Sequence, residues 1–274
     1  MKLKYLGTGA AEGVPAVFCN CEVCQNARKE GGRNIRTRSQ ALINDDLLID
    51  FPPDTYMHYL NYNFNLHGIT ELLVTHSHTD HFYAIEFEMR QGGLAHPTPE
   101  KMRIYCNKES EKKFYELLPS KFDADKYFEI IYAAPFVPIK IKDYTVVPLL
   151  ANHDKSEECL IFLISQGNKT ILYGNDTGFF PEETMDYLEK NNVYINLLSL
   201  DCTMQSRSEG TNHMGLMDNV EMRRRLEKIN AVDENTIFIA NHFSHNGGWN
   251  YEKMAEEAAK VGFLTTYDGM EVEI

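Results

Sequence analysis

The chain has 274 residues, 43% of them hydrophobic, and a formal net charge of −13 at pH 7. This length suffices for one large domain, so we expect residues 1–274 to fold as a single domain. The acidic charge argues against extended nucleic acid as a partner, and the absence of a long apolar run or an apolar signal core predicts a cytoplasmic protein with no membrane partner.

Short apolar runs alternate with amphipathic segments along the chain. The apolar runs predict strands at 2–7, 41–44, 47–51, 71–75, 103–106, 144–150, 159–165, 170–174, 195–200 and 236–240. Turn residues between the second and third runs, and in the segment QGNK, predict two hairpins. Helical periodicity predicts helices at 22–30, 109–118, 181–190, 220–229 and 251–261. This order favours sheets whose outer faces are covered by helices.

The segment THSHTDH follows the strand predicted at 71–75. It places His76, His78, Asp80 and His81 within six residues. Imidazole is a common ligand of zinc and related metals, and a carboxylate adds the negative charge that a second dication needs. A solvated polar loop would rarely contain so many ligand-type residues, so the segment predicts a metal site.

Three further ligand-type residues lie just after predicted strands. His153 follows the run VVPLLAN, Asp176 follows ILYGN, and His242 follows TIFIAN. Loops at the ends of strands that share a sheet meet at one edge, where rigid elements can hold ligands. Together with THSHTDH, these residues make a complete ligand set for two metals.

The six cysteines are unevenly distributed. Cys19, Cys21 and Cys24 form the segment CNCEVC, which is typical of a metal site and not of a secreted disulfide framework. The remaining three lie in apolar runs, where buried core residues are expected: Cys106, Cys159 and Cys202. Zinc usually takes four ligands, so a fourth ligand of the first cluster must come from elsewhere in the chain.

These motifs resemble the metallo-β-lactamase superfamily over nearly the whole chain. Within it, GTGAAEGVPAVFCNCEVC and NHFSH resemble the phosphoribosyl 1,2-cyclic phosphate phosphodiesterases of the carbon–phosphorus lyase pathway. The resemblance implies an α/β fold, a four-layer αββα sandwich with a small N-terminal zinc knot. It also implies that His245 completes this knot as the fourth ligand of a structural zinc, together with the three cysteines.

The resemblance further implies an enzyme with two catalytic divalent metals, zinc or manganese. His76, His78 and His153 would hold the first metal, and Asp80, His81 and His242 the second, with Asp176 and a hydroxide bridging them. Two dications bring four positive charges, of which two aspartates and the hydroxide cancel three. The remaining single charge matches a phosphodiester monoanion. The expected function is therefore hydrolysis of a small cyclic phosphodiester by attack of the bridging hydroxide, with Asp80 among the catalytic residues.

The family resemblance, or the position in the sequence, indicates roles for several other residues. His213 resembles the family's general acid, which would protonate the leaving group, although it also reads as a surface histidine. Asp50 and Asp201 end predicted strands and are candidates to hydrogen-bond ligand histidines, or they are turn residues. Three arginines in polar segments are candidates to hold a second phosphate on the substrate: Arg36, Arg38 and Arg207.

Some alternatives stay open at this point. Segment 82–143 matches the family poorly, and LIDFPPDTY lacks the glycine that often follows the early aspartate. The same metals could hydrolyse a lactone, thioester or β-lactam, and a related fold could serve as a non-catalytic binding protein in cofactor biosynthesis. A transfer-RNA nuclease would normally carry a basic arm, which is not visible in this acidic chain. The expected partner is a small molecule, and a homodimer is possible.

Overall fold

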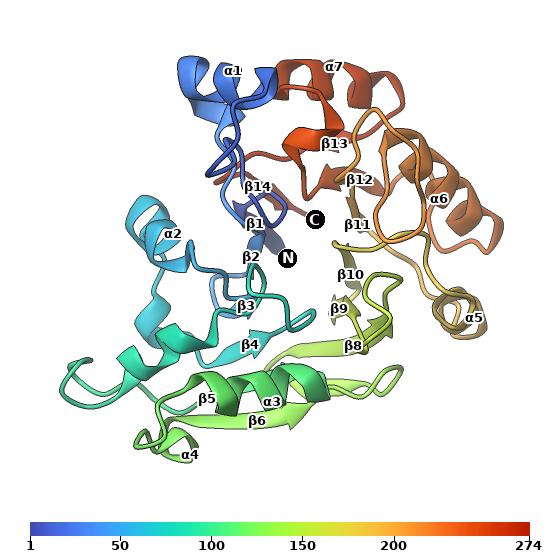
Figure 1. Cartoon of the computed structure of the whole chain (residues 1–274). Helices are drawn as coiled ribbons and strands as arrows, with labels where there is room; N and C mark the ends of the chain where they lie inside the picture. Colours follow the sequence, from blue (N-terminus) through green and yellow to red (C-terminus); the bar gives the residue numbers. More distant parts are fainter.

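The computed structural model describes residues 1–274 and contains two seven-stranded sheets (Figure 1). The first sheet has the order β14-β1-β2-β3-β4-β5-β6, with strands Glu271–Glu273, Lys2–Gly7, Gln40–Ile43, Leu47–Ile49, Glu71–Leu73, Met102–Cys106 and Phe128–Tyr132. The second has the order β13-β12-β11-β10-β9-β8-β7, with strands Leu264–Thr265, Ile237–Asn241, Leu197–Asp201, Lys169–Gly174, Leu160–Gln166, Tyr144–Leu150 and Ile139–Ile141.

Helices cover the outer faces of both sheets, as Figure 1 shows for α2 and α3 on one side and α5 and α6 on the other. The α-helices are α1 Glu22–Glu30, α2 Thr55–Tyr62, α3 Lys108–Leu117, α4 Ala124–Tyr127, α5 Glu182–Lys190, α6 Leu216–Lys228 and α7 Tyr251–Lys260. Four short 3₁₀ helices are η1 Gly32–Asn34, η2 Leu66–Gly68, η3 Ala84–Arg90 and η4 His245–Gly247.

Three apolar cores correspond to the three spaces between these layers. Alternation along a strand sends neighbouring residues into different cores: Ile171 of β10 packs between the sheets, whereas Leu172 packs outward. The outward core of the second sheet includes Leu188 of α5 and Met222 of α6, and that of the first sheet includes Phe114 of α3. The predicted four-layer αββα sandwich is therefore confirmed.

Most predicted elements lie close to the observed ones, and both predicted hairpins form. In the β2–β3 hairpin, Asn44 and Asp45 have φ values of 46° and 66°, the left-handed conformation that tight hairpin turns require. The sequence did not predict helix α2 or the short strands β6, β7, β13 and β14.

None of the helices is long and apolar enough to cross a membrane.

The strand directions bring one set of loops to a common edge of the sandwich. Strands β3 and β4 run parallel in the first sheet, as do β10, β11 and β12 in the second. The carboxyl ends of these strands lead directly into the segments that contain Asp50, His76, Asp176 and His242. This edge therefore collects the predicted metal ligands.

Candidate metal centre

Three residues at this edge adopt an unusual backbone conformation. Asp50, Asp176 and His242 have φ values of 64°, 55° and 63°, although none of them is glycine. Left-handed backbone at such residues costs of the order of 1–3 kcal/mol and is concentrated at functional sites. The turns after β10 and β12 bring two of these side chains together, with His242 Nε2 at 3.9 Å from Asp176 Oδ2.

The structure brings the seven predicted catalytic ligands into two adjoining clusters that share Asp176. Within each cluster the donor atoms all lie within 4.8 Å of one another. The first cluster contains His76, His78, His153 and Asp176, and the second contains Asp80, His81, Asp176 and His242. Asp176 Oδ2 lies 3.4 Å from His76 Nε2 and 3.1 Å from His81 Nε2, so this carboxylate is placed between the two clusters.

The side chains of these clusters fit metal ions. The Nε2 atoms of His76, His81 and His242 are buried and have no hydrogen-bond partner within the protein. Buried polar atoms are normally hydrogen-bonded, so three orphan nitrogens facing one carboxylate fit the coordination of a metal ion. Burial also lowers the pKa of His76 well below its ordinary value, which keeps the imidazole in the neutral form that binds metal.

Two aspartates hold the ligand histidines from behind, at the positions proposed from the sequence. His81 Nδ1 lies 2.7 Å from Asp50 Oδ2, and His242 Nδ1 lies 3.3 Å from Asp201 Oδ2. Thr203 adds a contact of 2.8 Å between its Oγ1 and His242 Nδ1. Carboxylates in this position fix the orientation of the ring and the nitrogen that faces the metal.

The sequence did not identify Asp154 as part of the site. Its Oδ2 lies 3.1 Å from His78 Nε2, while His78 Nδ1 faces His153 Nε2 at 3.3 Å. The contact with Asp154 occupies Nε2 of His78, so Nδ1 is the nitrogen that faces the cluster. The only sequence signal was its place immediately after His153.

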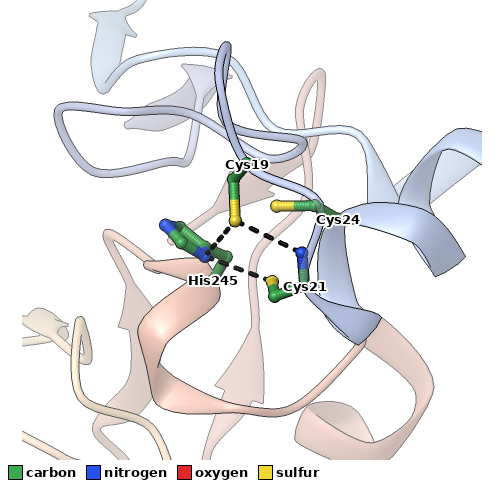
Figure 2. Close-up of side chains that lie close together, drawn as sticks. All are labelled: Cys19, Cys21, Cys24 and His245. Atoms are coloured by element: carbon green, nitrogen blue, oxygen red, sulfur yellow. Dashed lines mark hydrogen bonds between the residues drawn. The ribbon is translucent and has the colours of Figure 1, made fainter.

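The cysteines near the N-terminus meet His245 at the start of η4, as Figure 2 shows. The Sγ atoms of Cys19 and Cys21 lie 3.5 Å and 3.4 Å from His245 Nδ1, and the four donor atoms, including Cys24 Sγ, lie within 4.8 Å of one another. Ligands about 2.0–2.3 Å from a tetrahedral zinc would lie roughly 3.5–4 Å apart, so the set fits a closed zinc site.

Electrostatics and orientation in this cluster also suit a metal. Burial opposes ionisation of Cys21, but hydrogen bonds from the Cys24 backbone and His245 lower the pKa of this thiol to about 6. Thiolate is the form of cysteine that binds metal. Glu12 Oε1 lies 3.5 Å from His245 Nε2, on the side of the ring opposite to the sulfurs.

The two metal-ligand clusters open into a pocket of about 310 Å³. His213 is one of its lining residues, and its Nδ1 lies 3.1 Å from Asp176 Oδ1 and 3.3 Å from Asp201 Oδ2. Burial disfavours the charged imidazolium, but these two carboxylates raise the pKa of His213 to about 11. His213 is therefore positioned to keep a proton next to the clusters.

The three arginines proposed from the sequence do not line this pocket. Arg36 is 6% exposed, and its Nη1 donates to Thr8 Oγ1 at 2.8 Å and to the Thr266 carbonyl at 2.9 Å. The prediction that Arg36 holds a substrate phosphate is therefore wrong, because its guanidinium is a buried structural group.

Arg38 and Arg207 lie nearer to the surface. Arg38 pairs with Asp54 at 3.1 Å and donates from Nε to the Ala11 carbonyl at 3.0 Å, so it supports the loop that lines the pocket from outside. Arg207 is exposed on the loop that leads to His213.

Comparisons with solved structures agree with this fold. A diphosphatase of the PhnP family superposes with a TM-score of 0.75 at 21% identity, covering 100% of this chain and 97% of that one. Zinc-bound PqqB from Methylobacterium extorquens gives 0.74 at 15% identity, with 100% of both chains covered. Human tRNase Z, short form, gives 0.63 at 14% identity, covering 100% and 99%.

The fold and the two ligand clusters thus define a protein of the metallo-β-lactamase fold with a candidate two-metal centre. Residues 37–229, well over half of the chain, match the family described as anti-Pycsar protein Apyc1, and the chain belongs to that family. A curated relative, an octanoyltransferase from Porphyromonas gingivalis, is 27% identical over 168 residues, which are 57% of this chain. The match covers 31% of that relative, so the chain spans about a third of its length.

Proposed function

We propose that the protein is a metal-dependent hydrolase that opens a small cyclic phosphodiester. The observation that carries this proposal is the sharing of Asp176 between two adjoining ligand clusters at the floor of a pocket that also contains His213. One carboxylate between two cation sites is typical of centres that contact both sides of a single reacting group. Zinc and manganese both suit nitrogen and oxygen ligands, and zinc suits the cluster of three cysteines and His245.

Two bound dications would provide a nucleophile from water at neutral pH and stabilise negative charge on the phosphate oxygens. The protein's own groups complete the reaction. Asp176, Asp80 and the attacking hydroxide would offset three of the four positive charges of two dications, so the centre would favour a substrate with a single negative charge. His213 holds a proton beside the centre and would donate it to the oxygen that leaves phosphorus. Asp201 orients the His213 ring through Nδ1, which leaves Nε2 as the donating atom.

The size and lining of the pocket favour a small substrate that has no second phosphate group. At about 310 Å³ it lies at the lower end of the size range of small-molecule sites. The pocket is lined by Ala10, Ala11, Glu12, His78, Asp80, His153, Asp176, Thr203, Met204, His213, His242, Ser244 and Asn246. This lining contains neither lysine nor arginine, which usually bind an additional phosphate. A cyclic mononucleotide therefore fits the charge of the pocket better than phosphoribosyl 1,2-cyclic phosphate with its extra phosphate group.

A substrate panel tests this proposal. Purified protein loaded with zinc or manganese would be offered a 3′,5′-cyclic nucleotide, a 2′,3′-cyclic nucleotide, a ribose 1,2-cyclic phosphate 5-phosphate, a lactone, a thioester and a β-lactam. Turnover of the phosphodiesters, with the highest kcat/KM on those that lack a second phosphate, is the expected result. Turnover confined to the carbonyl substrates would replace the proposal with a carbonyl hydrolase. Absence of turnover with metals bound would favour a binding protein.

A further inference from the structure

Behind His81, buried hydrogen bonds lead to a histidine that belongs to neither metal cluster. Asp50 contacts His81 through its carboxylate, and its backbone carbonyl accepts a hydrogen bond of 2.9 Å from Gln40 Nε2. On the other side of that amide, Gln40 Oε1 lies 2.6 Å from His58 Nδ1. Asp50, Gln40 and His58 are each 0% exposed. Buried polar groups in such a series depend on one another for their hydrogen bonds.

Asp50 contacts His81 from two directions because of its left-handed backbone. Its Oδ2 reaches the His81 ring, and the next amide, that of Phe51, donates to the His81 carbonyl at 2.7 Å. Thr75 donates its backbone N–H to Asp50 Oδ1 at 2.8 Å. A rotation of the Asp50 peptide toward ordinary extended backbone would move both groups away from His81. The hydrogen bond from Gln40 to the Asp50 carbonyl therefore helps to fix the position of His81.

The neighbouring groups determine the orientation of the Gln40 amide. Gln40 Nε2 lies 3.0 Å from Thr55 Oγ1, and the Thr55 hydroxyl donates its proton to the Pro52 carbonyl at 2.7 Å. Nε2 thus faces two acceptors, which only the NH₂ end of the amide can satisfy. The carbonyl end must then face His58, so Nδ1 of His58 carries a proton and donates it.

The second nitrogen of His58 is also bound. Its Nε2 lies 2.7 Å from Thr37 Oγ1, which in turn lies 2.7 Å from Asp268 Oδ2. The Thr37 hydroxyl donates to Asp268 Oδ2, and the Thr37 backbone N–H donates to the same oxygen at 2.7 Å. Burial lowers the pKa of His58 to about 4. The His58 ring is therefore held at both nitrogens, with Nδ1 facing the Gln40 amide oxygen.

We propose that Gln40 and His58 are positioning residues of the metal centre, which hold the Asp50 peptide in the conformation that directs its carboxylate onto His81. Neither residue touches a ligand cluster, and each acts through the next group in the series. The proposal rests on the two-metal centre of the proposed function but not on its substrate. It can therefore be tested with metal alone.

The test compares zinc affinity in Gln40→Met with that of a matched control. The methionine fills a similar volume but cannot bond the Asp50 carbonyl, so zinc affinity at the His81 cluster is expected to fall about 10–100-fold. The cluster of His76, His78 and His153 serves as an internal control, and its affinity should change little. Gln166→Met makes the same chemical change in the facing sheet, where Gln166 Oε1 accepts from Asn44 Nδ2 at 2.9 Å.

Chelator competition on metal-loaded proteins would resolve the release steps of the two clusters from that of the zinc held by the three cysteines and His245. Selective weakening at the His81 cluster in Gln40→Met, with both steps unchanged in Gln166→Met, supports the proposal. Folded Gln40→Met with wild-type affinity at both clusters overturns it. If Gln40→Met does not fold, a measurement on the wild-type protein tests the same proposal. The ¹⁵N chemical shifts of His58 should report the Nδ1–H tautomer. The Nε2–H tautomer would overturn the proposal.

Discussion

Glu12 connects the cysteine–histidine cluster with the pocket beside the two metal-ligand clusters. Its Oε1 lies 3.5 Å from His245 Nε2, and the same residue lines the pocket. The Ser244 hydroxyl also donates to Glu12, and Ser244 lies two positions after the ligand His242. The cysteine–histidine cluster thus fixes the N-terminal segment against the loop that contains His242. Loss of the metal from this cluster should therefore also change the structure of the pocket.

Removing His245 should release one zinc ion per chain and loosen the pocket. In His245→Ala, the three cysteines lack their fourth ligand, and we expect Tm to fall by at least about 5 °C, which corresponds to roughly 2 kcal/mol for a chain of this size. Elemental analysis and thermal unfolding would measure both effects. Exposed His96→Ala is the matched control. An unchanged zinc count in His245→Ala would contradict the assignment.

Replacing Asp154 should weaken one catalytic cluster without changing its ligands. Asp154→Asn removes the carboxylate from His78 Nε2, so the ring no longer presents Nδ1 in a fixed orientation. We expect metal affinity at the cluster of His76, His78 and His153 to fall about 10–100-fold. Chelator competition would measure it, with Asp143→Asn as a control that makes the same charge change on an exposed turn. Equal affinities in the two variants would show that Asp154 does not orient the ligand.

Loss of His213 should depend on the leaving group of the substrate. A sugar alkoxide needs a proton to leave, whereas nitrophenolate leaves without one, and general acid catalysis contributes typically about 10²–10⁴-fold. His213→Ala should therefore lose about 100-fold or more in kcat on a cyclic nucleotide and less than about 10-fold on bis(nitrophenyl) phosphate. Steady-state kinetics on both substrates would measure the two losses. If the losses are equal, His213 is not the general acid.

Substitution of Arg36 should lower the stability of the protein, whereas substitution of Arg207 should leave it nearly unchanged. Arg36→Met leaves Thr8 and the Thr266 carbonyl without their buried donor, and we expect a loss of about 3 kcal/mol in the free energy of unfolding. Arg207→Met changes an exposed side chain, and its stability should stay within about 0.5 kcal/mol of wild type. Urea unfolding would measure both. A stable Arg36→Met protein would contradict the structural role given to the buried guanidinium.

The clustering of the candidate metal ligands could be predicted from the sequence because ligand chemistry and strand ends are both local signals. THSHTDH is dense in ligand types, and His153, Asp176 and His242 each follow an apolar strand. The fourth residue of the cysteine cluster is different, since His245 lies 226 positions from Cys19 and was predicted only through the family resemblance. Distant partners of this kind leave no spacing signal.

Other features depend on tertiary packing and could not be predicted. Arg36 occurs in a polar segment, but its guanidinium lies 4.1 Å from the Phe243 ring centroid in the core. Helix α2 has the sequence TYMHYLNY, whose aromatic and β-branched residues have low helix propensity. Strand β6 is largely half-exposed and β7 has only three residues, so neither shows a clear apolar pattern. These two strands lie in segment 82–143, which resembled the family least.

Hydrolysis of a 3′,5′-cyclic nucleotide, followed by ³¹P NMR in zinc- or manganese-loaded wild-type protein and in Asp176→Ala, tests the central claim most directly. The account predicts conversion of the cyclic diester to a monoester by the wild type, abolished by chelation and restored by added metal. It predicts a rate at least about 10³-fold lower in Asp176→Ala, because the bridging carboxylate is lost from both clusters. Undiminished hydrolysis by Asp176→Ala, or none by a wild-type protein with both cations bound, would contradict the account.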